Sequence, residues 1–523
     1  MTTLTGKIVY FTRWGTSILL VGIVAGAMAV LFPPMASIGF VALVGVLLLW
    51  ALPELRFVPE KSLRTLFFIM IMVQLCVPGY YAIDTGVLPW ISVRRLFSLA
   101  VIVLFSITVA GSRVARGEIA ATLRTNRLLA FATFGFLAMM FISLLTSVNT
   151  AQSLSQLVDG LLNWYVPLFA CILIIRREED VILLFKTIAV AAIIISLAGV
   201  IELILERRYY FDIFPKSILD SMLATNPALA KMFYNVTYRN GLYRASSIFS
   251  VPLSLGEFAA FVAPISAYFV LDGRGWRQRV LGVAVGICSL LAVFCSGARG
   301  GYTAILVAMP ILAVLWTIRY SKLNPHSLVG GILGTFFAIG ISSVFAMVAF
   351  WPRIHDMVLG NDWEGSESTD ARFEQWNLAL PHIYANPVTG HGMGNANGLI
   401  AYHLQDGVGS VDSYIITLLV DMGVPGVLLF FSMIAIAIWT AAYIYLTDAD
   451  KRAAICGPIA CCLIAFAVYR TALSQVENHN LFFIFIGLVF ATSKLNYDRR
   501  PKTAAPRLRF AGVQSTRQHR IGG

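Results

Sequence analysis

The sequence predicts an all-α, polytopic integral membrane protein. Of its 523 residues, 58% are hydrophobic and only 13% are charged, which is too little charge for a soluble chain of this length. The mean hydropathy is +0.78. Apolar runs of about 17–25 residues, the length that a membrane-spanning helix requires, recur along the chain. We therefore expect about fourteen spanning helices, within a range of about 12–14.

The expected spans follow one another closely in the first two thirds of the chain. They cover residues 14–32, 35–53, 65–81, 96–111, 128–147, 157–175, 181–204, 253–272, 280–297, 302–318, 328–351, 423–446, 453–472 and 480–494.

Basic residues in short loops indicate orientation, because such loops stay on the cytoplasmic side. They lie in the loops 54–64, 112–127, 273–279 and 319–322, which fall on every second connection. Both termini are therefore predicted to be cytoplasmic. The net charge of +12 reflects this bias and attraction to anionic membrane lipid, so we expect no nucleic-acid partner.

This topology divides the chain into six regions. They are an N-terminal membrane region (1–204), a periplasmic loop (205–252), a central membrane region (253–351), a large periplasmic loop (352–422), a C-terminal membrane region (423–494) and a cytoplasmic basic tail (495–523). The first long loop is mainly basic and the second mainly acidic, so the two could close over a shared site.

The large loop contains two segments with a readable pattern. Residues 371–386 have apolar side chains at helical spacing, which predicts an amphipathic helix. The next stretch, "NPVTGHGMGNANG", is rich in Pro and Gly and predicts a series of turns. It follows no strand, so we reject a dinucleotide-binding interpretation and expect a tight turn that places His391 near the site.

Two arginines are placed at the outer ends of spans, against the inside bias. Arg244 precedes the span 253–272, and Glu257 lies about one turn inside that span. Arg299 lies in "CSGARGG", where small residues permit close approach of a phosphate and a guanidinium can bind its oxygens. For Arg244, the structural alternatives are an ion pair with Glu257 or a side chain that extends to the lipid headgroups.

Four further side chains are candidates with a structural alternative. Arg372 and Trp376 lie one helical turn apart and could bind phosphate or sugar, or could be a surface charge and a membrane anchor. Arg470, near an outer end, could support the site or form a structural pair. In "SVDSYIITLLVDMGVPG", Asp412 either caps a helix or takes part in chemistry, whereas Asp421 is interpreted as a loop or capping residue. No clustered metal ligands or nucleotide-binding motif appear, so we expect neither metal nor cofactor.

These segments, in this order, resemble the O-antigen ligase and polymerase superfamily of bacterial envelope glycosyltransferases. The resemblance rests on "YRASSIFSVPLSLGEF", "CSGARGG" and "ARFEQWNLALPHIYANPVTGHGMGN". A last motif follows, in which Asp412-Ser413 is separated by nine residues from Gly423, with Gly426 three residues further on. It covers roughly residues 240–440 and implies a GT-C-like helical membrane enzyme.

The resemblance implies transfer of a glycan from undecaprenyl diphosphate to an acceptor hydroxyl at the periplasmic face, without metal or nucleotide. Arg244, Arg299 and, more loosely, Arg372 match the arginines that hold the donor diphosphate. Asp412 stands where ligases carry a catalytic His, a departure that favours a repeat-unit polymerase of exopolysaccharide, capsule or O-antigen. His391 and His479 are the alternative general bases.

Other functions stay open. A ligase would transfer finished glycan to lipid A core or to protein. A lipid-linked oligosaccharide flippase or transporter belongs to a different class, but transporters tend to bury charge at mid-membrane in repeated halves. A third alternative is an inert partner in an export complex. For a polymerase, we expect a chain-length regulator and an export complex as partners.

Overall fold

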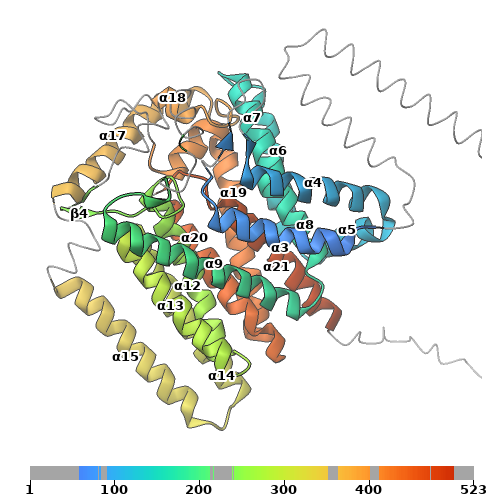
Figure 1. The fold of residues 1–523 in the computed structure, drawn as a ribbon, viewed down its shortest axis with the longest axis vertical. Coiled ribbons are helices and arrows are strands. Elements are labelled where there is room, and N and C mark those ends of the chain that lie inside the picture. Colours follow the sequence, from blue (N-terminus) through green and yellow to red (C-terminus); the bar gives the residue numbers. More distant parts are fainter. Residues whose placement is uncertain are drawn as a thin grey trace, which may run out of the picture.

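The computed structural model is a bundle of long helices (Figure 1). It describes residues 58–79, 82–83, 91–211, 216, 238–239, 241–351, 363–400, 411–471 and 473–499. The first two predicted spans, most of the loop 205–252, parts of the large loop and nearly all of the basic tail lie outside the described residues.

The helices follow the predicted spans closely. They are α3 (Glu60–Cys76), α4 (Val93–Gly111), α5 (Arg113–Thr125), α6 (Arg127–Leu144), α7 (Thr150–Gly160), the π-helix η1 (Leu161–Tyr165), α8 (Val166–Ile174), α9 (Glu178–Leu205), η2 (Tyr209–Phe211), α12 (Pro252–Leu271), α13 (Trp276–Ser296), α14 (Arg299–Leu323), α15 (Leu328–Phe350), α17 (Trp363–Ala385), α18 (Ala396–Ile400), α19 (Tyr414–Thr447), η3 (Lys451–Ile455), α20 (Cys456–Arg470) and α21 (His479–Arg499). Two short antiparallel ladders join β1 (Ala82–Ile83) to β2 (Ile91–Ser92) and β3 (Tyr238–Arg239) to β4 (Leu242–Tyr243).

Eleven helices of the described part are long and apolar enough to cross a membrane, which confirms the all-α polytopic class. Helix α3 adds a seventeen-residue helix at the lower limit of spanning length. One prediction was wrong in detail: the loop 112–127 is mostly helix α5. Its N-cap Ser112 accepts a hydrogen bond from the Ala115 N–H, and this capping starts a helix that hydropathy alone does not reveal.

Helix α19 begins at Tyr414, earlier than the predicted span 423–446. Gly423, with φ 68° and ψ −174°, interrupts its helical backbone, and Pro425 follows directly after this kink. Positive φ is tolerated by glycine because it has no Cβ. The predicted boundary between loop and span therefore coincides with this break.

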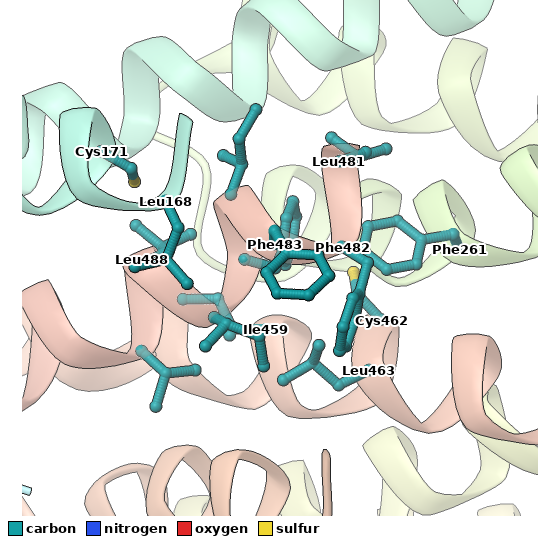
Figure 2. Close-up of a cluster of buried hydrophobic side chains, with 14 of the residues drawn as sticks. Leu168, Cys171, Phe261, Ile459, Cys462, Leu463, Leu481, Phe482, Phe483 and Leu488 are labelled. Carbon is teal, nitrogen blue, oxygen red and sulfur yellow. The ribbon is translucent and has the colours of Figure 1, made fainter. Parts of the chain in front are cut away.

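The core lies where α12, α20 and α21 meet, because these are the most enclosed spans, with 83%, 78% and 78% of their apolar windows buried. Figure 2 shows aromatic and aliphatic side chains from these helices interdigitating, with Leu168 and Cys171 of α8 alongside. Phe466 and Phe482 stack with ring centroids 4.3 Å apart. Phe261 meets Phe485 edge-on at 4.7 Å. Such aromatic pairs stabilise a core beyond their burial.

Helix α15 is the opposite extreme. Figure 1 shows it lying apart from the main bundle, next to α14, and only 6% of its apolar window is buried within the chain. Its large side chains, among them Phe336 and Ile339, face outward. In a membrane protein such a surface contacts lipid.

The two ends of the bundle differ in composition. At the basic end, which comprises residues 58–64, 111–127, 174–180, 271–279, 319–325, 447–456 and 494–499, ion pairs join neighbouring connections: Arg64–Asp180, Arg176–Glu118, Arg452–Glu178 and Arg499–Asp448. The opposite end, here called the site end, comprises residues 77–79, 91–95, 145–149, 241–251, 296–299, 386–396, 411–413 and 471–479. The connections predicted to share one side of the membrane therefore gather at one end.

A close contact between α21 and α8 predicts the sensitivity of one glycine. A Cβ added to Gly487 would lie 2.5 Å from the Leu168 carbonyl oxygen, so the helices would have to separate. We expect Gly487→Ala to lower the free energy of unfolding by about 1–3 kcal/mol. Thermal unfolding in detergent measures this effect. Gly331→Ala is the matched control, because nothing lies within 4 Å of its added Cβ; equal stability of the two variants would contradict the prediction.

Candidate functional site

The two outer arginines meet at the turn between α13 and α14. Helix α13 ends at Gly297, whose φ of 57° reverses the chain, and α14 begins two residues later at Arg299. Arg244 donates from Nε to the Ser296 carbonyl at 2.9 Å. The next residue, Ala245, donates its N–H to Cys295 at 2.8 Å. Arg244, 55 positions earlier in the sequence, therefore packs against the turn that carries Arg299.

Tight helix packing supports this turn from the inside. A Cβ on Gly256 of α12 would lie 2.8 Å from the Ala298 Cβ and 2.7 Å from the Tyr469 hydroxyl oxygen. Tyr469 donates that hydroxyl to the Leu253 carbonyl at 2.8 Å. Small residues here let α12 and α20 approach the turn closely. The small residues of this turn therefore have a packing role in addition to the predicted one of letting a phosphate approach.

A buried carboxylate that the sequence analysis missed organises the segment before α12. Glu202 near the end of α9 is fully buried, and it accepts the N–H groups of Ser246 and Ser247 at 3.2 and 2.6 Å. The Tyr243 hydroxyl donates to it at 2.9 Å, and the Arg208 Nε lies 3.9 Å away. Glu202 therefore fixes the backbone on both sides of Arg244. A carboxylate inside a predicted span was the signal that could have identified it.

Two further features of that segment show how tightly it is held. Ser247 has φ 51°, an uncommon conformation for a residue other than glycine. Its N–H donates to Glu202 and its hydroxyl donates to the Ile195 carbonyl at 2.8 Å. Burial raises the pKa of the Tyr243 hydroxyl, and the Glu202 carboxylate beside it raises that pKa further, so Tyr243 stays a hydrogen-bond donor.

A second buried ion pair joins α12 to α20. Glu257 and Arg470 are both buried and form a direct salt bridge, so the ion partner of Glu257 is Arg470 rather than the alternative considered from sequence, Arg244. Asn478 donates to Glu257 at 2.8 Å and to the Ser254 carbonyl at 3.0 Å. The guanidinium of Arg470 also lies 5.5 Å from the Tyr414 ring centroid. This network ties Asn478, directly before α21, and Arg470, at the end of α20, to α12.

His479, at the start of α21, is fully buried among aromatic rings. Its ring centroid lies 5.1 Å from Trp164 and 5.0 Å from Tyr414. Among the described residues, neither ring nitrogen has a hydrogen-bond partner.

Helix α17 reaches the start of α19 through one hydrogen bond. The buried Gln375 accepts the Asp412 N–H at 2.9 Å. Arg372 lies one turn earlier, and its buried Nε has no hydrogen-bond partner among the described residues. Trp376 is exposed. The Asp412 side chain is half-buried, and the N-cap of α19 is the next residue, Ser413.

His391 lies in the glycine-rich turns, with both ring nitrogens engaged. Nε2 lies 2.9 Å from the His382 carbonyl, and the Asn386 amide nitrogen lies 3.3 Å from Nδ1. A neutral imidazole protonated at Nε2 fits both partners. The His391 carbonyl accepts from Val148, at the connection of α6 and α7. The turns themselves agree with the prediction, because Gly390, Gly392 and Gly394 all have positive φ.

Asp421 anchors these turns. Its two carboxylate oxygens accept the N–H of Gly394 at 2.7 Å and of Ala396, the first residue of α18, at 2.8 Å. Pro387 accepts from Val424 at 2.8 Å, just past the Gly423 break. The interpretation of Asp421 as a capping residue agrees with this geometry, although it sits within a helix.

Asp412, Arg470 and His479 share one neighbourhood. The Ser474 hydroxyl donates to the Val411 carbonyl, and the Tyr414 ring contacts both Arg470 and His479. Glu257 belongs to the same neighbourhood because it forms a salt bridge with Arg470. Tyr469, the residue before Arg470, packs against Gly256 beside the turn that carries Arg299. His391 belongs instead to the turns that pack against residues 146–153. Among the described residues, no three His, Cys, Asp or Glu side chains cluster as a metal site would need.

Fold and site together define a multi-pass membrane protein with an arginine-bearing polar site at one end of its helices. Residues 283–431 match the family described as O-antigen ligase. This match supports membership of the O-antigen ligase and polymerase superfamily, whose members are glycosyltransferase-like enzymes. The match supports a glycan-processing function at a bacterial membrane. None of the curated proteins matches the chain.

The matched region is narrower than the stretch that carries the resemblance in sequence. It includes Arg299, Arg372, His391 and Asp412, but it does not extend to Arg244, Glu257, Arg470 or His479. Those four residues are tied to it through the α13–α14 turn and the α12–α20 ion pair.

The Glu202 network predicts a loss of stability on charge removal. Glu202→Gln replaces an acceptor oxygen with an amide donor opposite N–H groups, which should lower the free energy of unfolding by about 1–3 kcal/mol. Thermal unfolding in detergent measures the change. Glu206→Gln at the exposed end of the same helix is the control, and equal effects of the two substitutions would refute a special role for Glu202.

The Asp421 contacts predict a comparable effect in the glycine-rich turns. Asp421→Asn leaves one of two buried N–H groups without an acceptor, which should cost about 1–3 kcal/mol of stability. The exposed Asp498→Asn serves as control. Limited proteolysis of residues 386–400 should accelerate in Asp421→Asn only; unchanged cleavage rates would show that the carboxylate does not anchor the turns.

Proposed function

We propose that this protein is a polymerase that joins undecaprenyl-diphosphate-linked repeat units into exopolysaccharide, capsule or O-antigen. The observation that carries the proposal is the convergence of Arg244 and Arg299 on one turn at the site end. Two arginines at one turn, with the segment of Arg244 held by the buried Glu202, suit a diphosphate better than a neutral ligand.

The reaction breaks the bond between the anomeric carbon and the diphosphate oxygen. An acceptor hydroxyl oxygen forms the new bond to that carbon, and the diphosphate leaves with the electron pair. Negative charge grows on the leaving group as the bond breaks, so Arg244 and Arg299 stabilise the transition state more than the ground state. Arg372, whose buried Nε has no partner among the described residues, is the third candidate for this role.

The acceptor hydroxyl must lose its proton, and Asp412 is our choice for the base. Gln375 fixes its backbone, and it lies two residues before Tyr414, which contacts Arg470 and His479. His391 is a weaker candidate, because both of its nitrogens already have partners. His479 is a weaker candidate as well, because rings surround it and an acceptor would have to displace them.

The setting follows from the positive-inside rule. The basic end faces the cytoplasm together with both termini, and the site end faces the periplasm of a bacterial inner membrane. The donor and the growing acceptor are both membrane-borne there, so neither nucleotide nor metal is required by the proposal. A chain-length regulator and an export complex would act as partners.

The family description favours a second candidate, an O-antigen ligase. A ligase would use the same arginines and differ in its acceptor, which would be lipid A core or protein. A flippase or transporter is less well supported, since Arg244, Arg299, Arg372 and Asp412 gather at one end of the bundle rather than at mid-membrane.

Reconstitution separates these functions. Purified protein in proteoliposomes receives a lipid-linked oligosaccharide repeat unit, and products are resolved by gel electrophoresis. A ladder of longer lipid-linked glycans supports the polymerase. Transfer of preformed polymer to lipid A core without a ladder identifies a ligase, and movement across the bilayer with no new glycosidic bond identifies a flippase.

Asp412 provides the sharpest variant. Asp412→Asn retains size but cannot take a proton, so we expect at least a roughly hundredfold loss of polymer at unchanged protein level. The control is Glu374→Gln on the exposed face of α17. Full polymer yield from Asp412→Asn, with yield lost in His391→Gln, would move the base to His391.

A further inference from the structure

A cavity of about 240 Å³ lies at the site end, apart from the arginine turn. Its walls come from α3, α4, the π-helix η1 and the start of α21. One ordered water needs only about 10–15 Å³ on this measure, so the cavity has room for a small organic group. It adjoins the proposed site, because Phe249, Glu477 and Asn478 form part of its wall.

The cavity lining combines an apolar wall with polar side chains, and hydrogen bonds among themselves order several of these polar groups. Asn163 donates to Asp159 at 2.6 Å, and Gln74 donates to Ser98 at 2.9 Å. The Asn480 amide in turn donates to Gln74. Two oxygens of the lining, Asn480 Oδ1 and Glu477 Oε2, are buried and have no hydrogen-bond partner among the described residues. Buried acceptors without partners are unfavourable until a ligand supplies donors.

The charges of the lining argue against a phosphate. Arg94 and Arg95 line the cavity together with Asp159 and Glu477, so cationic and anionic side chains balance. The wall also includes the Trp164 ring and the apolar side chains of Leu481 and Ile484. An aromatic wall with a few placed polar groups is the general pattern of small-molecule sites. An uncharged sugar fits this pattern, because its hydroxyl groups can donate to the unpartnered oxygens while its ring lies over the Trp164 ring.

We propose that this cavity binds a sugar ring of the glycan acceptor and so determines which glycan the enzyme extends. This inference rests on the proposed transferase function. The wall residues connect the two sites directly: Glu477 accepts the Ser250 N–H at 3.0 Å, six residues after Arg244, and Asn478 donates to Glu257. An acceptor seated in the cavity would thus lie beside the segment that carries the donor-binding arginine.

Asn163→Leu tests the proposal, because leucine keeps the branched shape of asparagine and removes its polar atoms. Loss of one or two sugar hydrogen bonds should raise the KM for acceptor about fivefold to tenfold and leave kcat unchanged. The matched control is Ser155→Leu, an exposed polar position on α7. Unchanged KM in Asn163→Leu, with elongation by the wild type intact, would refute the cavity assignment and leave the proposed function standing.

A binding measurement is independent of turnover. Saturation-transfer NMR on protein in a sugar-free detergent, with glucose, galactose, rhamnose and N-acetylglucosamine as probes, should show transfer to at least one sugar. Asn163→Leu should reduce that signal at least about threefold, while Ser155→Leu retains it. No transfer to any of the four sugars, or transfer to glycerol phosphate instead, would overturn the proposal. Sugar binding without elongation of lipid-linked oligosaccharide would count against the polymerase alone.

Discussion

A carboxylate enclosed in a helical membrane bundle is stable only if donors surround it, and this constraint fixes the site. Glu202 and Glu257 are both buried, and each draws its donors from a connection between helices. Glu202 holds residues 243–247, and Glu257 holds Arg470 and Asn478 at the two ends of the connection between α20 and α21. The segment that bears Arg244 and the connection before α21 are thus bound to the bundle rather than left to solvent.

Backbone breaks provide the second constraint. Gly423 interrupts α19 at the point where residues 387–388 pack against it. A side chain would not fit there, since an added Cβ would lie 2.5 Å from the Pro387 carbonyl oxygen. The same approach brings Asp421 to the amides of the glycine-rich turns. The two parts of α19 therefore differ in position: the part before Gly423 contributes to the site end, and the part after it crosses the bundle. Helix α19 therefore begins directly after Asp412 and Ser413, and through Asp421 it anchors the turns of His391.

The sequence predicted the helices well, because the length of an apolar run is a direct consequence of membrane thickness. It also located Arg244 and Arg299, since a charge against the inside bias stands out without any tertiary knowledge. It could not assign the partner of Glu257, because Arg470 is more than two hundred residues away. Glu202 lies inside a predicted span, which marks it as a candidate, but its role could not be assigned because its donors include the backbone amides of Ser246 and Ser247, which carry no mark in the sequence. Helix α5 was missed because its caps and basic side chains resemble those of an ordinary loop.

Helix α15 has a consequence for biogenesis. With only 6% of its apolar window buried, it gains almost nothing from tertiary contacts and must enter the bilayer on hydropathy alone. Its side chains need to be apolar, but few need to be of a given shape. Selection on this segment would therefore act on its insertion by the translocation machinery. The side chains of α12, α20 and α21 are constrained instead by the shape of the packed interior.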